Sequence, residues 1–298
     1  MPEVCEVLLT SQYLSKLIGY SLIEVTPVNG RYMKNSIKGL NKIKFPLTVK
    51  NIQTKGKFMW FTFKHHDEIY YLLCTFGLTG RWSFEELDQT RVLFTFKKNT
   101  KEKIVKVYYD DMRNFGTLEF TNDVKILDKK LNSLGDDLLQ SKYSHNDIKQ
   151  RLDAIENHNK KIVVVLMDQT KKNGIGCGLG NYLVPEILYT SKISPRRTIG
   201  SLTEYDIKNL TNAIKSTLYI YYNNNTTQYI DHLRKFLKKH AKYIKDGKYP
   251  SFHSSHKNNY VDEEFKVYGR IKDDIGNNVT ADKIIPGRTT YWVPNIQK

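Results

Sequence analysis

Cysteine is scarce in this chain of 298 residues, which contains only three, placed far apart. They are Cys5, Cys74 and Cys177. An odd number of widely spaced cysteines supports neither a disulfide framework nor a Cys-x-x-Cys zinc site. The histidines at 65, 66, 253 and 256 have no cysteine or carboxylate at ligand spacing. We therefore expect no bound metal.

Long apolar runs are absent as well. No stretch of about 18 apolar residues is present, and no basic and then apolar leader opens the sequence. We therefore expect neither membrane insertion nor secretion, and an intracellular protein that acts where DNA is, in the nucleus or the cytoplasm.

Acidic residues are too few to balance the basic ones. There are 31 of them against 47 lysines and arginines, which gives a formal net charge of +16 and a pI of about 9.5. Such a surplus favours a polyanionic partner, either nucleic acid or an anionic membrane surface. The length suits two domains, or one large domain with additions.

The first part of the chain is β-rich and follows one short helix. Val7, Leu14, Leu17 and Ile18 fall on one helical face, so Pro2 is expected just ahead of a helix over 6–18. Short β-forming runs follow between turn residues, at 47–52, 58–63, 69–74, 91–96, 104–109 and 116–120. Because several runs are apolar on both faces, we expect a two-sheet sandwich or a flattened barrel.

The next part of the chain has helical periodicity. The polar stretch 121–135 indicates a linker, and Ser144 with Asp147 indicates a helix start. Further helices are expected at 161–168, 181–189, 203–222 (capped by Thr203 with Asp206) and 227–240. The polar stretch 241–262 is typical of a loop that serves a site, and 263–298 is β-like again.

The first residues carry the clearest chemical signal. Methionine is usually removed before proline, which would leave Pro2 as a secondary amine that is partly neutral and nucleophilic at pH 7. With a carbonyl-like carbon this amine forms a cationic iminium, an electron sink that permits elimination. Glu3 and Glu6 stand beside it. Taken alone, these residues also fit an ordinary chain start.

A glycine-rich segment, 174–181, lies between two helical regions. It is not a Rossmann fingerprint, because no strand of a βαβ unit precedes it. Glycines allow a backbone to approach a ligand closely, and N–H groups at a helix start bind phosphate. With Lys171, Lys172 and Asn181 nearby, the segment suits a phosphate backbone, although a flexible turn between helices explains it equally well.

Two turns, 76–81 and 111–116, carry bulky residues at their tips. Each alone favours a plain hairpin, but apolar wedges paired with an arginine also fill the gap left by a base taken out of a duplex. Lys57, at the start of a strand, is by itself typical of a solvated edge residue.

These pieces occur in order, and together they resemble the formamidopyrimidine-DNA glycosylase and endonuclease VIII family of base-excision repair enzymes. The matching motifs are Pro2-Glu3-x-x-Glu6, Gly56-Lys57, Phe76-Gly77-Leu78-Thr79-Gly80, Asp111-x-Arg113-x-Phe115-Gly116, Asp168-Gln169, Gly180-Asn181-Tyr182, Glu186-Ile187-Leu188-Tyr189 and Val267-Tyr268-Gly269-Arg270.

The resemblance implies an α+β fold. An N-terminal two-sheet β-sandwich with an initial helix would occupy 1–122 and a linker 123–134. A helical helix-two-turns-helix domain with the lesion loop would occupy 135–262, its hairpin centred on 170–182. The remaining residues, 263–298, would form a β-hairpin finger, and DNA would bind between the domains.

The chain departs from the family pattern near its end. The family normally carries a four-cysteine zinc finger there, but no cysteine follows Cys177. An arginine-bearing hairpin tip, 286–291, is nevertheless present and is followed by Trp292, so this part is similar to the zincless finger of Nei-like enzymes and related plant and fungal enzymes. The glycine-rich segment is longer than usual, which favours Asn181 over Asn173 as a phosphate ligand. Asn114 replaces a frequent second arginine, so weaker opposite-strand contacts are expected.

By resemblance, the chain is a bifunctional DNA glycosylase and AP lyase that acts as a monomer, without a cofactor, on double-stranded DNA containing a damaged base or an abasic site. Pro2 would attack C1′, and Glu3, with Glu6 nearby, would assist proton transfer. Lys57 and Arg288 would hold the flanking phosphates. Leu78, Arg113 and Phe115 would fill the gap, and Asn181 would bind phosphate.

Alternatives to this hypothesis remain. A non-catalytic basic DNA-binding protein explains the charge but not the coincidence of Pro2, Glu3 and Lys57, and a tautomerase with an N-terminal proline does not fit the length, the charge or the helical half. For the lesion, oxidised pyrimidines and ring-opened purines are favoured over 8-oxoguanine, with an 8-oxoguanine-preferring enzyme of the same family as the alternative.

Overall fold

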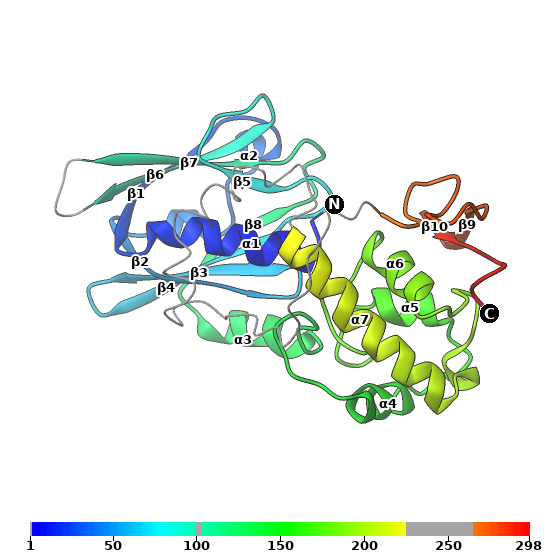
Figure 1. The fold of residues 1–298 in the computed structure, drawn as a ribbon. Coiled ribbons are helices and arrows are strands. Elements are labelled where there is room, and N and C mark those ends of the chain that lie inside the picture. Colours follow the sequence, from blue (N-terminus) through cyan, green and yellow to red (C-terminus); the bar gives the residue numbers. More distant parts are fainter. Residues whose placement is uncertain (1, 99–102, 225–264) are drawn as a thin grey trace. The chain divides into compact units, whose positions relative to one another are not determined.

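The computed structural model describes residues 2–98, 103–224 and 265–298, which form two compact units (Figure 1). The first unit contains Pro2 and Glu6–Leu131, and the second contains Glu3–Cys5 and the described residues from Asn132 onward. The predicted helix at 227–240 and the predicted loop at 241–262 lie outside the described residues. Among the helices of the described residues, none is long and apolar enough to cross a membrane.

The first unit is built mainly from strands, with helical elements before the first strand, between β1 and β2 and after the last strand. Its helical elements are α1 (Val4–Leu14, whose first two residues belong to the second unit), η1 (Ser15–Leu17), α2 (Arg31–Lys34), η2 (Leu40–Lys42) and α3 (Val124–Ser133). Its strands are β1 (Tyr20–Pro27), β2 (Leu47–Lys55), β3 (Phe58–His65), β4 (Glu68–Thr75), β5 (Arg81–Ser83), β6 (Thr90–Lys98), β7 (Ile104–Asp110) and β8 (Thr117–Thr121).

The strands of this unit form one antiparallel sheet in the order β5-β7-β6-β1-β2-β3-β4-β8. Its two halves are joined by a short β1–β2 ladder, in which Ser21 and Leu22 pair with Thr48 and Leu47. The sheet folds over itself, because the rings of Trp82 on β5 and Phe61 on β3 lie 5.3 Å apart although several strands separate them in the sheet. The predicted α+β fold with a layered β-domain is confirmed. One detail differs, because the two layers share a continuous ladder instead of forming separate sheets.

Aromatic side chains fill the space between the two layers. Trp82 packs against Phe94 and Tyr109 with centroid separations of 4.9 and 5.3 Å, and Val7 and Leu14 of α1 join the same buried cluster. Burying each such side chain stabilises the fold by about 1.5–3 kcal/mol. The helix pattern over 6–18 therefore marks the face of α1 that covers the core.

The stretch predicted as a linker is helical over most of its length, because it forms α3. Leu127 is buried, while Val124 and Ile126 are exposed. The apolar spacing is short and interrupted by lysines, so the helical period is weak in the sequence. The sequence did not indicate this helix, and the bounds of the linker stay a prediction.

The second unit contains a bundle of helices and a β-hairpin. Its elements are α4 (His145–Asp153), α5 (Ile162–Met167), α6 (Leu183–Thr190), η3 (Ile199–Ser201), α7 (Glu204–Asn224), β9 (Thr280–Ile285) and β10 (Arg288–Trp292). The predicted cap of α4 is a reciprocal capping box between Ser144 and Asp147. Thr203 and Asp206 make the same pair of bonds at the start of α7.

Candidate active site

The carboxylate of Glu3 is held by the backbone at the start of α6. Glu3 is completely buried, and its Oε1 accepts a hydrogen bond from the backbone N–H of Tyr182 at 3.0 Å. The backbone N–H of Val4 donates to the carbonyl of Gly178 at 3.1 Å. The predicted anion preference of this helix start is thus met by a side chain of the protein itself.

Glycine is required where this turn meets the N-terminal residues. A Cβ on Gly180 would lie 2.5 Å from Oε1 of Glu3, and a Cβ on Gly178 would lie 2.7 Å from Cβ of Val4. Gly178 also has a φ of +117°, which other residues rarely adopt. These two glycines therefore bring the backbone against Glu3 and Val4, a role that the sequence did not indicate.

Asn181 is half-buried beside this turn. Its Oδ1 is buried and accepts no hydrogen bond from the described residues. An amide side chain supplies two N–H donors that suit a phosphate oxygen. Its assignment as a phosphate ligand stays a prediction.

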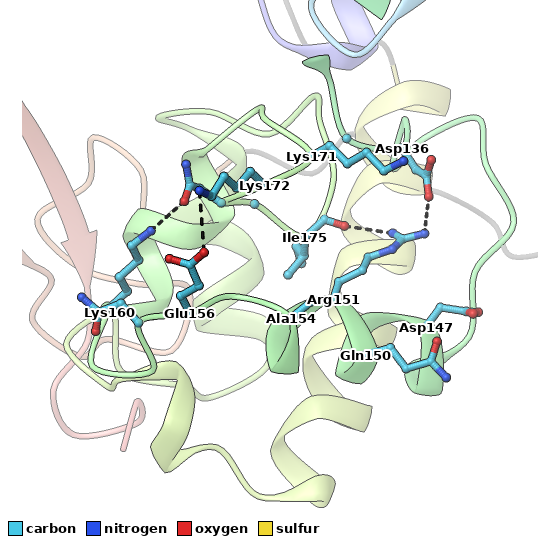
Figure 2. A pocket seen from close by; sticks show the side chains of 14 residues that line it. Asp136, Asp147, Gln150, Arg151, Ala154, Glu156, Lys160, Lys171, Lys172 and Ile175 are labelled. Atoms are coloured by element: carbon cyan, nitrogen blue, oxygen red, sulfur yellow. Dashed lines mark hydrogen bonds and ion pairs between the residues drawn. The ribbon is translucent and has the colours of Figure 1, made fainter. Parts of the chain in front are cut away.

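The preceding part of the glycine-rich segment is anchored from α4 (Figure 2). Arg151 donates to the carbonyl of Ile175 at 2.9 Å and to the carboxylate of Asp136 at 2.5 Å. Nearby, Lys160 donates to Oδ1 of Asn173 at 3.0 Å, so this weaker phosphate candidate already has a partner. These residues line a pocket of about 440 Å³ that contains both cationic and anionic side chains.

The two bulky turn tips are brought together in the first unit. The hydroxyl of Thr79 donates to Asp111 at 2.5 Å and accepts the backbone N–H of Arg113 at 3.0 Å. Asp111 also accepts the N–H of Gly116 at 2.7 Å. Phe115 is 60% exposed at the tip.

Two arginines that were not predicted donate hydrogen bonds to backbone carbonyls of the 111–116 loop. Arg31 donates to the carbonyls of Asn114 (3.2 Å) and Gly116, and Arg91 donates to those of Asp111 (2.8 Å) and Met112 (3.2 Å). Arg31 lies more than 80 residues from its partners, so no local pattern could have revealed it.

Asn114 has a structural reason to be asparagine. Its φ is +56°, in the left-handed region where asparagine is several times more frequent than most residues.

The remaining predicted residues of the first unit lie at the start of α1 and in the turn between β2 and β3. Pro2 is buried directly before α1, and Glu6 is 4% exposed within that helix. Lys57 is half-exposed in the turn between β2 and β3, beside Gly56 with a φ of +58°.

Arg288 opens β10 in the second unit and is exposed, with its Nη1 3.6 Å from Sδ of Met167. Neither unit by itself therefore carries every predicted catalytic residue.

Asp282 of the C-terminal hairpin makes one hydrogen bond within the hairpin and one to the loop between α6 and η3. Asp282 accepts from the indole of Trp292 at 2.9 Å and from Arg196 at 2.7 Å. These two bonds lower the pKa of Asp282.

Glu186 ties down the segment that leads to the hairpin, since it accepts the backbone N–H groups of Lys266, Val267 and Tyr268 at 2.8–3.0 Å. Burial raises the pKa of Glu186 despite these bonds.

Three family models match the chain in succession. They describe the N-terminal domain of formamidopyrimidine-DNA glycosylase at residues 1–118, its H2TH domain at 134–245 and its C-terminal domain at 258–298. The chain belongs to the formamidopyrimidine-DNA glycosylase family. As a member, it is an enzyme of the DNA glycosylase and AP lyase class.

Relatives in this family extend over most or all of the chain. Formamidopyrimidine-DNA glycosylase of Bacillus cereus (strain ATCC 10987) is 28% identical over 234 residues, which cover 73% of this chain and 76% of the relative. The enzyme of the same name from Lactococcus lactis subsp. lactis is 25% identical over 305 residues, with both chains fully covered.

Solved structures share the fold. The formamidopyrimidine-DNA glycosylase of Lactococcus lactis, non-covalently bound to DNA containing an AP site, has a TM-score of 0.72 with 20% identity and 99% of each chain covered. The MutM (Fpg) protein from Thermus thermophilus also gives 0.72, with 20% identity over 99% of this chain and 98% of that one.

Proposed function

We propose that this enzyme removes oxidised bases from double-stranded DNA and then cleaves the strand, with Pro2 as the nucleophile. The observation that carries the proposal is the buried, fixed carboxylate of Glu3, which directly follows the proline. A carboxyl group held beside a nucleophilic amine is suited to move protons on and off the sugar during attack and ring opening.

The proposed reaction begins when the Pro2 nitrogen bonds to C1′ and the bond from C1′ to the base breaks, so that the base leaves with the glycosidic electrons and a proton. Opening of the sugar ring gives an iminium between Pro2 and C1′. This electron sink acidifies the neighbouring C2′ proton, and β-elimination then breaks the bond between C3′ and its phosphate oxygen. A δ-elimination releases the second phosphate, and water hydrolyses the iminium to regenerate Pro2.

The other predicted residues take supporting roles in this proposal. Lys57 and Arg288 neutralise the flanking phosphates, and Glu6 stands near the nucleophile in the sequence. Leu78, Arg113 and Phe115 fill the space of the displaced base, and Asn181 binds a backbone phosphate. The finger needs no metal, because hydrogen bonds at Asp282 and Glu186 hold its segment. The enzyme would act on DNA in the nucleus or the cytoplasm, as a monomer.

Borohydride reduction tests the nucleophile. Because an iminium is reducible, borohydride should trap the protein on a duplex that contains an abasic site, and mass spectrometry should locate the adduct on Pro2. Pro2→Gly keeps an N-terminal amine but makes it primary, so some trapping should persist. In a chain that retains Met1, the nitrogen of Pro2 is part of a peptide bond. We therefore expect either no adduct or an adduct at a residue other than Pro2. An adduct on a lysine of the unmodified enzyme would disprove the assignment.

A lesion panel tests the substrate. We expect oxidised pyrimidines and ring-opened purines to be excised faster than 8-oxoguanine, measured on duplexes with one lesion opposite each normal base. The alternative, an enzyme that excises 8-oxoguanine fastest, belongs to the same family as the relatives named formamidopyrimidine-DNA glycosylase. Fastest excision of 8-oxoguanine opposite cytosine would reverse the substrate assignment and leave the Pro2 chemistry standing.

A further inference from the structure

Gln169 uses its whole side-chain amide on backbone groups around the glycine-rich turn. Its Nε2 donates to the carbonyls of Met167 at 2.8 Å and Leu179 at 2.9 Å, and its Oε1 accepts the N–H of Gly178 at 2.8 Å. The amide therefore joins the end of α5 to residues 178–179. A carboxylate or an apolar group of similar size cannot make this set of two donations and one acceptance.

The turn that Gln169 holds is the one that contacts the N-terminal residues. The N–H of Gly178 binds Gln169 while its carbonyl accepts the N–H of Val4. Gly180, one residue beyond Leu179, leaves the space that the Glu3 carboxylate occupies. A short path of hydrogen bonds and backbone thus connects Gln169 with Glu3.

This turn has little rigidity of its own. Four of the seven residues from 174 to 180 are glycine, and glycine has the greatest backbone freedom to lose on folding. Its conformation must therefore be imposed by partners, and Gln169 supplies hydrogen bonds to two consecutive residues of the turn.

We propose that Gln169 is a positioning residue for catalysis, which fixes the glycine-rich turn and through it the Glu3 carboxylate beside Pro2. The inference rests on the proposed role of Glu3 in the reaction. Gln169 contacts no substrate in this scheme. Because catalytic groups displaced by about 1 Å lose on the order of 100-fold in rate, loosening the turn slows proton transfer and leaves DNA binding in place.

Arg151 provides a matched control within the same segment. It holds Ile175, three residues before Gly178, and its other partner is Asp136. Removing its bonds should therefore cost stability of the helical unit without acting on residues 178–180.

The experiment compares Gln169→Met, Gln169→Glu and Arg151→Met in the full-length protein. Single-turnover excision rates are measured across pH on a lesion-containing duplex, together with melting temperature and DNA affinity. For both Gln169 variants we expect a rate about 10- to 100-fold lower, an altered pH–rate profile and unchanged DNA affinity. Gln169→Glu keeps an acceptor for the N–H of Gly178, so it tests the positioning role if Gln169→Met does not fold. For Arg151→Met we expect a lower melting temperature with the normal pH–rate profile.

A folded Gln169 variant with the normal rate and pH–rate profile would overturn the positioning role. So would Arg151→Met if it changed the profile in the same way, because the effect would then be general loosening of the unit. Failure of the Pro2 mechanism is recognised separately, by the borohydride adduct of the unmodified enzyme, which does not depend on Gln169.

Discussion

A single missing side chain, at Gly180, decides where the Glu3 carboxylate can lie. The turn packs so closely that even a methyl group would lie only 2.5 Å from Oε1 of Glu3. The same argument explains why a glycine-rich segment here is not simply a flexible connection. Gly178 and Gly180 are needed for close contact with Val4 and Glu3.

Gly180→Ala should therefore displace Glu3 and slow base excision by about 10- to 100-fold, because a misplaced catalytic group costs rates of this order. Single-turnover kinetics on a lesion-containing duplex measure the effect. Gly200→Ala is the control, since its Cβ would come no closer than 3.0 Å, to the exposed His158. Equal rates for the two variants would contradict the steric argument.

Among the elements, the C-terminal hairpin depends on one carboxylate. Asp282 on β9 joins Trp292 on β10 to Arg196, and these bonds lower its pKa. A carboxyl group whose pKa is lowered on folding stabilises the fold above its unfolded pKa, and the contribution is lost as pH falls through the folded value. The hairpin should thus loosen in acid.

The indole N–H resonance of Trp292 provides the measurement. We expect it to shift and to exchange faster with solvent as pH falls below the ordinary range for aspartate, and Asp282→Asn should abolish this pH dependence. Trp82 is an internal control, because its indole donates to Cys74 at 3.4 Å, and burial raises the pKa of that thiol to about 12. A Trp292 signal that does not respond to acid would remove Asp282 from this role.

For the whole molecule, the positive charge is the dominant electrostatic feature. With a net charge of +16, the logarithm of DNA affinity should fall steeply and linearly with the logarithm of salt concentration, because phosphate contacts release counterions.

If Arg288 binds a phosphate, Arg288→Ala should reduce the slope of log affinity against log salt concentration by about one. Fluorescence anisotropy over a salt series measures this slope. Lys64→Ala is the control, because it also removes one positive charge. Lys64 lies near the end of β3 with its Nζ 3.6 Å from the carboxylate of Asp67, and its removal should leave the slope unchanged. Identical slopes for both variants would mean that Arg288 contributes only to the overall charge.

The features that could be predicted from the sequence have local signals. The caps at Ser144 and Thr203 were predictable because capping joins residues three positions apart, and six of the strands were predictable from apolar and β-branched runs. The family followed from ordered motifs that run from Pro2 to Arg270. The strands β1 and β5 and the helix α3 were not predicted. The short β5 and the lysine-interrupted α3 have no strong period.

The contacts between these motifs depend on the folded structure and could not be predicted from the sequence. The N–H of Tyr182 reaches Glu3 across 179 residues, and Arg31 reaches the 111–116 loop across more than 80. Such contacts leave no periodic trace in the sequence, because they depend on how packed elements bring distant backbone groups within hydrogen-bonding distance. The glycine-rich segment could therefore be predicted as a close-approach turn, but its partner, the carboxylate beside Pro2, became known only when the chain was folded.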